Sequence, residues 1–120
     1  MRDLTAFQRK IVQVLAEDSM YGLAIKRELE NYYGDEVNHG RLYPNLDELV
    51  DIGYVRKNEL DKRTNEYELT DRGVEKLTEE MRWEIERYIR GNGSLDDIDS
   101  LFPDGVEVDA DVELETKAHE

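Results

Sequence analysis

Residues 38–55 read NHGRLYPNLDELVDIGYV, and this run contains one compact helical pattern. Leu42, Leu46 and Leu49 recur at spacings of four and three, which is the period of one face of a helix. Asn38 precedes the pattern and can cap the helix through its side-chain oxygen. The run therefore predicts a short, half-buried helix whose remaining faces are open to solvent or to a ligand.

Two more helices are predicted upstream of this run. The first extends from about Thr5 to Ala16 and begins with Thr5 and Gln8 in the spacing of a capping box, and the second ends at Gly34. The inward face is predicted to contain Leu4, Phe7, Ile11, Val14 and Leu15 in the first helix, and Tyr21, Ile25, Leu29 and Tyr32 in the second.

A hairpin and a long helix are predicted downstream. Residues 54–57 and 66–69 are typical of strands, and the polar stretch 61–65 between them indicates a β-hairpin. Thr70 can cap a fourth helix that extends to about Arg90. Its apolar stripe protrudes beyond a small core and is predicted to form a dimer interface, with Leu77, Met81, Ile85 and Tyr88 as the dimerisation residues and Val74 on the same stripe.

The last 30 residues differ in character. Ser94 can cap a short helix, in which Leu95, Ile98, Leu101 and Phe102 are expected to face inward. Residues 106–114 alternate strictly between apolar and acidic side chains, which favours an extended strand over the alternative, a disordered acidic tail. Trp83 falls opposite the stripe of the long helix, and we expect Leu101, Phe102 or the tail of either subunit to cover it, stacking on Arg87 being the alternative.

The charge of the chain is unusual for a nucleic-acid-binding protein. Residues 1–90 contain 15 Lys and Arg against 20 Asp and Glu, net −5, and residues 91–120 contain one Lys against 10 Asp and Glu, net −9, which gives −14 in all. A polyanion should repel such a chain, but at molar salt the Debye length is only ~3 Å. The composition therefore indicates a halophilic source.

Several classes of protein are disfavoured by composition. With no cysteine there is neither a disulfide nor a thiolate metal cluster, and two remote histidines do not suggest a ligand pair, so we expect no metal and no cofactor. Nucleophile motifs and phosphate loops are missing, which argues against an enzyme. No apolar run approaches the ~20 residues of a membrane span, and the N-terminus has no apolar signal region, so a cytoplasmic protein without membrane contact is expected.

The order helix, helix, half-buried helix, basic hairpin, long helix is typical of a winged helix-turn-helix, whose third helix enters the major groove of DNA. Arg41 is placed to read a guanine or to contact a phosphate at the helix N-terminus, and Asn45 to pair with an adenine edge; the alternative for both is a solvated side chain. Tyr43 either faces DNA or packs between the second and third helices. The candidate DNA contacts of this helix are Asn38, His39, Gly40, Arg41, Tyr43, Pro44 and Asn45.

Basic residues also gather on the hairpin. Lys62 and Arg63 at its tip suit a narrow minor groove, with Arg56 and Lys57 on its first strand, although charges on an edge strand also prevent aggregation. Lys26 and Arg27 on the second helix are weaker candidates for backbone contacts, the alternative being surface pairs with Glu30.

Three segments together resemble the PadR family of transcriptional regulators. They are YGLAI at 21–25, GRLYPNL at 40–46 followed by Leu49 and by GYV at 53–55, and YELTDRG at 67–73. The resemblance covers residues 4–90 and implies a dimeric regulator whose recognition helix carries Arg41, Tyr43 and Pro44 next to DNA. The short, acidic form is similar to halophilic archaeal members of the family, whereas the acidic tail departs from the family pattern.

The sequence thus predicts a mostly α, α+β chain: a winged helix-turn-helix DNA-binding domain (1–70), a dimerisation helix (71–90) and an acidic tail (91–120). The function predicted is that of a sequence-specific, homodimeric regulator that binds double-stranded DNA. The alternative is a winged-helix module that binds only other proteins of the transcription machinery. No feature identifies a small-molecule inducer.

Overall fold

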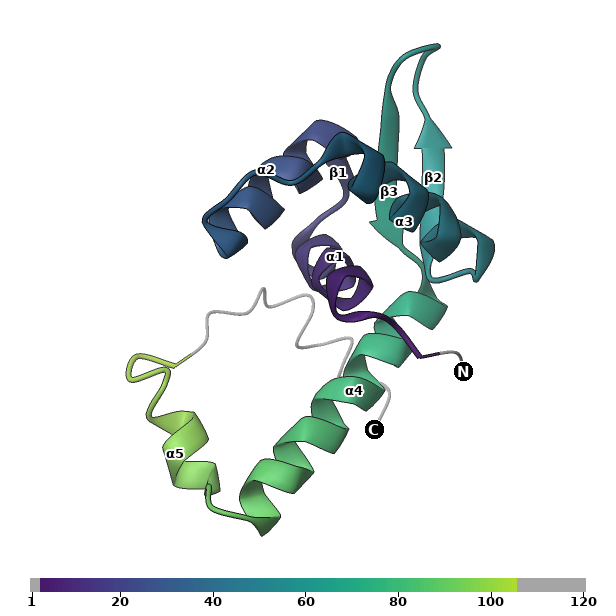
Figure 1. Ribbon diagram of the computed structural model, residues 1–120. Helices are drawn as coiled ribbons and strands as arrows, with labels where there is room; N and C mark the ends of the chain where they lie inside the picture. Colours follow the sequence, from purple (N-terminus) through teal and green to yellow (C-terminus); the bar gives the residue numbers. More distant parts are fainter. Residues whose placement is uncertain (1–2, 106–120) are drawn as a thin grey trace. The chain divides into compact units, whose positions relative to one another are not determined.

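The computed structural model describes residues 3–105 (Figure 1). These residues form two compact units divided after Arg82. The first unit contains α1 (Ala6–Glu17), β1 (Met20–Tyr21), α2 (Gly22–Tyr33), α3 (His39–Asp51), β2 (Val55–Glu59), β3 (Asn65–Leu69) and the first part of α4 (Asp71–Arg90). The second unit contains the rest of α4 and α5 (Leu95–Asp99). The alternating residues 106–114, for which a strand is predicted, lie outside the described residues.

The first unit is mostly helical, with a small antiparallel sheet of strand order β1-β3-β2. In its register Val55 faces Leu69 and Lys57 faces Tyr67, while Met20 of β1 pairs with Tyr67 from the other side. The side chains that are completely buried come from α1, α2, α3 and the turn that leads into β2: Ile11, Val12, Ile25, Leu29, Leu42, Leu46, Leu49 and Tyr54. The predicted fold class is therefore confirmed, and the three leucines of α3 reach the core as expected.

The predicted helix ends are confirmed by their hydrogen bonds. Thr5 and Gln8 form the capping box, with Thr5 N donating to Gln8 Oε1 and Gln8 N donating to Thr5 Oγ1, each at 3.1 Å. Gly34 ends α2 with a φ of 70°, and Asn38 Oδ1 accepts from Gly40 N at 2.7 Å. The helix α3 thus begins directly after Asn38 and runs on through Pro44.

The short strand β1 was not predicted, because a strand of two residues has no periodicity to detect. Its formation places Tyr21 beside Glu66 of β3 rather than on the inward face of α2. Tyr21 is 48% exposed and Tyr32 is 62% exposed, so the expectation that both face inward is wrong.

The start of α4 packs closely against the end of α3. Thr70 Oγ1 donates to the carbonyl of Gly53 at 2.6 Å and accepts from Gly73 N at 3.1 Å, as expected of an N-cap. A Cβ at Gly73 would overlap the backbone carbonyl of Tyr54. Only a glycine therefore allows this close approach, which explains why the YELTDRG segment ends in glycine.

In the second unit, Ser94 Oγ accepts from Asp97 N at 3.1 Å and begins α5, as predicted. The inward orientation expected around α5 is not found for Leu95 and Leu101, which are exposed to about 70%, or for Phe102, which is exposed to 49%, whereas Ile98 is half-buried. Trp83 is 59% exposed, and the guanidinium of Arg87 lies 4.7 Å from its ring centroid. Within the described part of a single chain, Trp83 is therefore stacked on Arg87 rather than covered by Leu101 or Phe102.

Candidate DNA interface

The helix α3 presents differently occupied faces. Gly40 and Pro44 are exposed on the side away from the core, where a DNA groove would lie. The leucine face is buried. The flank of α3 that faces α1 carries three residues at helical spacing, Arg41, Asn45 and Glu48. A helical wheel places these residues nearer to the outer face of α3 than the structure does.

Arg41 rests on α1. Its guanidinium carbon lies 3.9 Å from the centroid of the Phe7 ring, and Phe7 in turn stacks on Tyr33 of α2 with 6.2 Å between ring centroids. Arg41 nevertheless remains exposed as a residue. A cation over an aromatic face is held by the ring quadrupole, and the N–H groups in the plane of the guanidinium stay available to donate.

Asn45 is engaged at both ends of its amide. Its Nδ2 donates to the carbonyl of Arg41 at 2.8 Å, and its Oδ1 accepts from Gln8 Nε2 at 3.1 Å. A bidentate contact with adenine needs the same two groups. Reading an adenine would therefore compete with both hydrogen bonds.

Tyr43 is half-buried and packs against the core, over the start of α2. A Cβ at Gly22 would overlap the Tyr43 ring, and the ring of His39 lies 4.2 Å from that ring on the other side. The interpretation of Tyr43 as packing between α2 and α3 therefore has direct geometric support, while His39 is left exposed.

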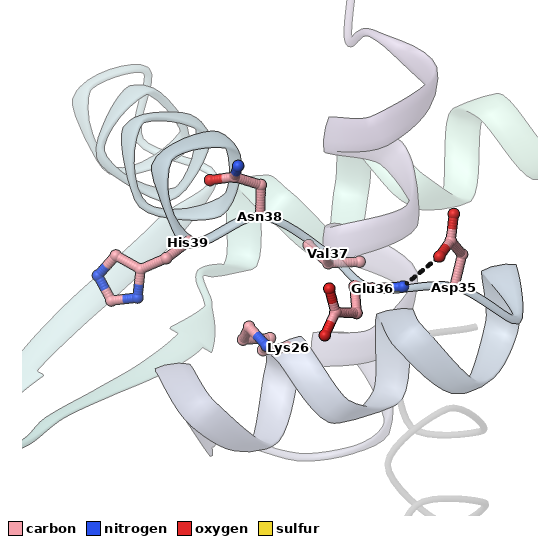
Figure 2. A pocket seen from close by; sticks show the side chains of 6 residues that line it. All are labelled: Lys26, Asp35, Glu36, Val37, Asn38 and His39. Carbon is pink, nitrogen blue, oxygen red and sulfur yellow. Dashed lines mark hydrogen bonds between the residues drawn. The ribbon is translucent and has the colours of Figure 1, made fainter.

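An open depression of about 540 Å³ lies between α2 and the loop that leads into α3 (Figure 2). It is lined by Lys26, Asp35, Glu36, Val37, Asn38 and His39. Lys26 Nζ forms an ion pair with Glu30 at 2.9 Å, which is the surface pair given above as the alternative to a DNA contact. Arg27 is exposed. Carboxylates and cations are mixed in this lining, so the depression favours no single class of ligand.

The hairpin of β2 and β3 forms the wing. Lys62 and Arg63 are exposed at its tip, where the Asp61 carboxylate accepts from Arg63 N at 2.8 Å and shapes the turn. Lys57 is exposed on β2. Arg56 differs, because its guanidinium donates to Glu68 on β3 at 2.8 Å. The tip therefore offers more accessible positive charge than the strand.

Three carboxylates in this region have lowered pKa values. The pKa of Glu30 is lowered by hydrogen bonds from Lys26 and from Val37 N, and that of Glu68 by Asn58 and Arg56. The pKa of Asp61 is lowered mainly by the Arg63 backbone. All three are thus held ionised.

Tyr67, a buried residue of β3, has instead a raised pKa. Burial raises the pKa of its hydroxyl, and the negative charge of Asp47 on α3 adds to the effect. Asp47 is itself exposed. The charge of this α3 carboxylate is therefore felt at Tyr67 of β3.

The predicted dimerisation residues divide into two groups. Leu77 is only 8% exposed and belongs to the core of its own unit. Met81, Ile85 and Tyr88 are between 39% and 48% exposed, and Val74 is 51% exposed. The stripe thus leaves four large apolar side chains on α4 accessible to solvent.

The described residues give no sign of other sites. Among residues 3–105 no group of three His, Asp or Glu could hold a metal ion. In the same range no helix is long and apolar enough to cross a membrane.

The sequence profile described as "Transcriptional regulator PadR-like family" matches residues 11–79, more than half of the chain. The chain belongs to the PadR-like family. The match includes all three segments that resemble the family, and it spans α3 and the wing. Of the resemblance over residues 4–90 it leaves out residues 4–10 and 80–90. This PadR-like chain is accordingly a DNA-binding transcriptional regulator, and the protein-only alternative is not favoured.

Solved structures of RosR from Halobacterium salinarum are similar to this PadR-like chain. One has 53% sequence identity and a TM-score of 0.80, and the alignment covers 86% of this chain and 94% of the other. A complex of RosR aligns equally well, with 92% of that chain covered. No curated protein sequence matches the chain.

More distant structures share the fold. PadR from Bacillus subtilis in complex with operator DNA has 22% identity and a TM-score of 0.55, and the alignment covers 66% of this chain and 48% of the other. A winged-helix DNA-binding protein from STIV has 20% identity and a TM-score of 0.59, with 77% and 99% covered. These likenesses support the winged-helix architecture of the PadR-like chain.

Phe7 and Gln8 also belong to this region. Their local spacing indicates only a core position for Phe7 and a capping box for Gln8. The two α3 residues that Gln8 contacts, Asn45 and Glu48, lie 37 and 40 positions away in the sequence. No local pattern predicts contacts at such a separation.

Proposed function

We propose that the protein binds DNA as a homodimer, with α3 of each subunit in the major groove and the wing on the adjacent backbone or minor groove. The observation that carries the proposal is the combination, in one unit, of an outer α3 face bordered by Arg41 and a wing whose tip exposes Lys62 and Arg63. This pairing of a groove-sized helix with a basic hairpin matches how winged helices dock.

The dimer is proposed from the exposed stripe of α4. Val74, Met81, Ile85 and Tyr88 leave apolar surface that a partner helix would remove from water at roughly 25 cal/mol per Å². Two subunits related by a twofold axis would place two copies of α3 on successive major grooves. The match to a family of transcriptional regulators and the similarity to RosR support a regulator of this kind.

We further propose that the protein works in a cytoplasm of high salt. The support is the net charge of −14 together with the similarity to a protein of Halobacterium salinarum. Screening at molar salt removes most of the long-range repulsion between an acidic protein and DNA, and short-range contacts then determine binding.

Selection of binding sites from a random pool of DNA duplexes, carried out in molar KCl, tests these proposals together. The expected result is a palindromic consensus whose half-sites lie about one helical turn apart, roughly 34–36 Å. Light scattering should give twice the chain mass of 14.1 kDa. Enrichment of a single half-site would contradict the dimer, and no enrichment at any salt concentration would contradict sequence-specific binding.

A further inference from the structure

The first turn of α1 contacts two other helices through three consecutive side chains. The ring of Phe7 lies under Arg41 of α3, and Gln8 donates two hydrogen bonds to α3. Arg9 Nε lies 3.1 Å from a carboxylate oxygen of Glu80 on α4. One turn of α1 therefore connects the proposed recognition helix with the proposed dimerisation helix.

Gln8 uses its whole side-chain amide in this connection. Its Oε1 accepts from Thr5 N, while its Nε2 donates to Asn45 Oδ1 at 3.1 Å and to Glu48 Oε2 at 2.9 Å. The backbone N–H of Thr5 can only donate, so the oxygen must face it and the NH₂ group must face α3. Gln8 is 1% exposed, and breaking this set would leave a buried polar group without its partners.

The contacts of Gln8 define which side chains of α3 can meet a base. Asn45 is held with its carbonyl toward Gln8 and its NH₂ toward the carbonyl of Arg41. Glu48 is drawn toward α1 in the same way. Arg41, on the same flank, is stacked on Phe7 and keeps only its in-plane N–H groups for a ligand.

We propose that Gln8 is a positioning residue for DNA recognition, which with Phe7 fixes the Arg41–Asn45–Glu48 flank of α3 so that Arg41 alone of the three reads bases. This rests on the proposed function. Gln8 itself touches no DNA. Asn45 serves as the link between Gln8 and the Arg41 backbone, and not as an adenine reader.

The test compares Gln8→Met with Gln13→Met, the same exchange on α1 at a half-buried position outside the described α3 contacts. The probes are a duplex selected with the wild-type protein from a random pool and a shuffled duplex of equal composition. For Gln8→Met the ratio of the two affinities should fall by about fivefold or more, while the affinity for the shuffled duplex is kept. Gln13→Met should leave the ratio unchanged.

Asn45→Ala supplies the second measurement. If Asn45 acts through Gln8, the double variant Gln8→Met/Asn45→Ala should lose no more discrimination than either single variant, because residues in one network are not additive. Additive losses would mean that Asn45 reads a base independently, and they would overturn the proposal.

A charge exchange keeps the proposal testable if Gln8→Met folds poorly. Gln8→Glu retains an acceptor for Thr5 N, as in capping boxes with Glu, but places two carboxylates together. The ratio of affinities should fall in Gln8→Glu and recover in Gln8→Glu/Glu48→Gln, in which the amide donor stands on α3 instead. No recovery, or equal loss for selected and shuffled duplexes in every Gln8 variant, would show a structural role only.

Failure of this proposal is distinguishable from failure of the proposed function. If the wild-type protein enriches no duplex, sequence-specific binding itself is absent. If it enriches a duplex and the Gln8 variants keep the wild-type ratio, the protein reads DNA but Gln8 does not position the reader.

Discussion

Arg41 is the only Lys or Arg on α3, so the charge that this helix can offer to DNA depends on one side chain. Its guanidinium carbon lies 3.9 Å from the centroid of the Phe7 ring, and this contact reduces the conformational freedom that an exposed arginine would otherwise lose on binding. A guanidinium fork presents two N–H groups to guanine O6 and N7 in a fixed planar geometry, whereas the ammonium group of a lysine is a flexible point charge with less directional selectivity. The geometry of this residue therefore favours base reading over a diffuse phosphate contact.

The first prediction separates Arg41 from the wing. Arg41→Ala should weaken binding to the selected duplex by about 1–3 kcal/mol and relax the preference at one base pair, because a bidentate contact is lost. Arg41→Lys should retain the charge and still lose the preference. Lys62→Ala and Arg63→Ala should weaken binding to all duplexes similarly and should make the affinity depend less steeply on salt concentration. Affinities for selected and shuffled duplexes measure both effects, and equal loss of preference from both sets would refute this division.

The surroundings of a candidate DNA contact can be predicted from the sequence where they depend only on neighbouring residues of the same element. Arg41 and the wing tip are exposed, and the ion pair of Lys26 with Glu30 follows from a spacing of four. The engagement of Asn45 by Gln8 and of Arg56 by Glu68 depends on how distant segments pack. A helical wheel gives the direction of a side chain but not the neighbour it meets.

Among the elements, those with clear periodicity were predicted nearly to their ends, because a buried face of three or four apolar residues leaves little freedom of register. The capping residues Thr5, Asn38 and Ser94 fixed the helix starts for the same local reason. The strand β1 escaped prediction, since its pairing with β3 is entirely non-local. Exposure of the residues around α5 also depends on what surrounds them and not on their spacing.

The second prediction concerns the junction between α3, β2 and α4. Gly73→Ala should lower the free energy of unfolding by about 1–3 kcal/mol, because the new methyl group meets the carbonyl of Tyr54 and forces the start of α4 to shift. Glu79→Ala, at an exposed position of the same helix, should change it by less than about 0.5 kcal/mol. Urea unfolding followed by circular dichroism measures both, and an unaffected Gly73→Ala would show that α4 can move away freely.

The third prediction tests the stripe of α4. Met81→Glu/Ile85→Glu should give a monomer in light scattering, because two carboxylates would have to be buried in the proposed interface. Affinity for the palindromic duplex should fall strongly, since each subunit then binds its half-site alone. Met81→Leu/Ile85→Leu keeps the apolar surface and should remain dimeric. A dimer that persists in the Glu variant would place the interface elsewhere.

At the scale of the whole molecule, the acidic residues are unevenly distributed along the chain. The segment 91–120 accounts for −9 of the total charge of −14, whereas the part of the chain with α3 and the wing is closer to balance. On α3, Glu48 accepts a hydrogen bond from Gln8, whereas Asp47 is exposed. Asp51 at the end of α3 is exposed as well, but Asp47 follows the exposed Pro44 by three residues, so we expect Asp47 to lie nearer to a bound phosphate backbone.

The fourth prediction follows from this carboxylate. Ordinary binding releases counterions, and the logarithm of the affinity falls with the logarithm of salt concentration by about 0.9 per neutralised phosphate. A carboxylate near phosphate repels it unless a cation enters between them, and uptake of that cation offsets part of the release. We therefore expect a shallow slope and retained affinity in molar KCl, and a steeper slope in Asp47→Asn. Glu79→Gln changes the net charge equally on an exposed position of α4 and should leave the slope unchanged. Titrations of the selected duplex from low to molar KCl measure all three proteins, and a steep, continuous loss of affinity in the wild type would exclude cation uptake at α3.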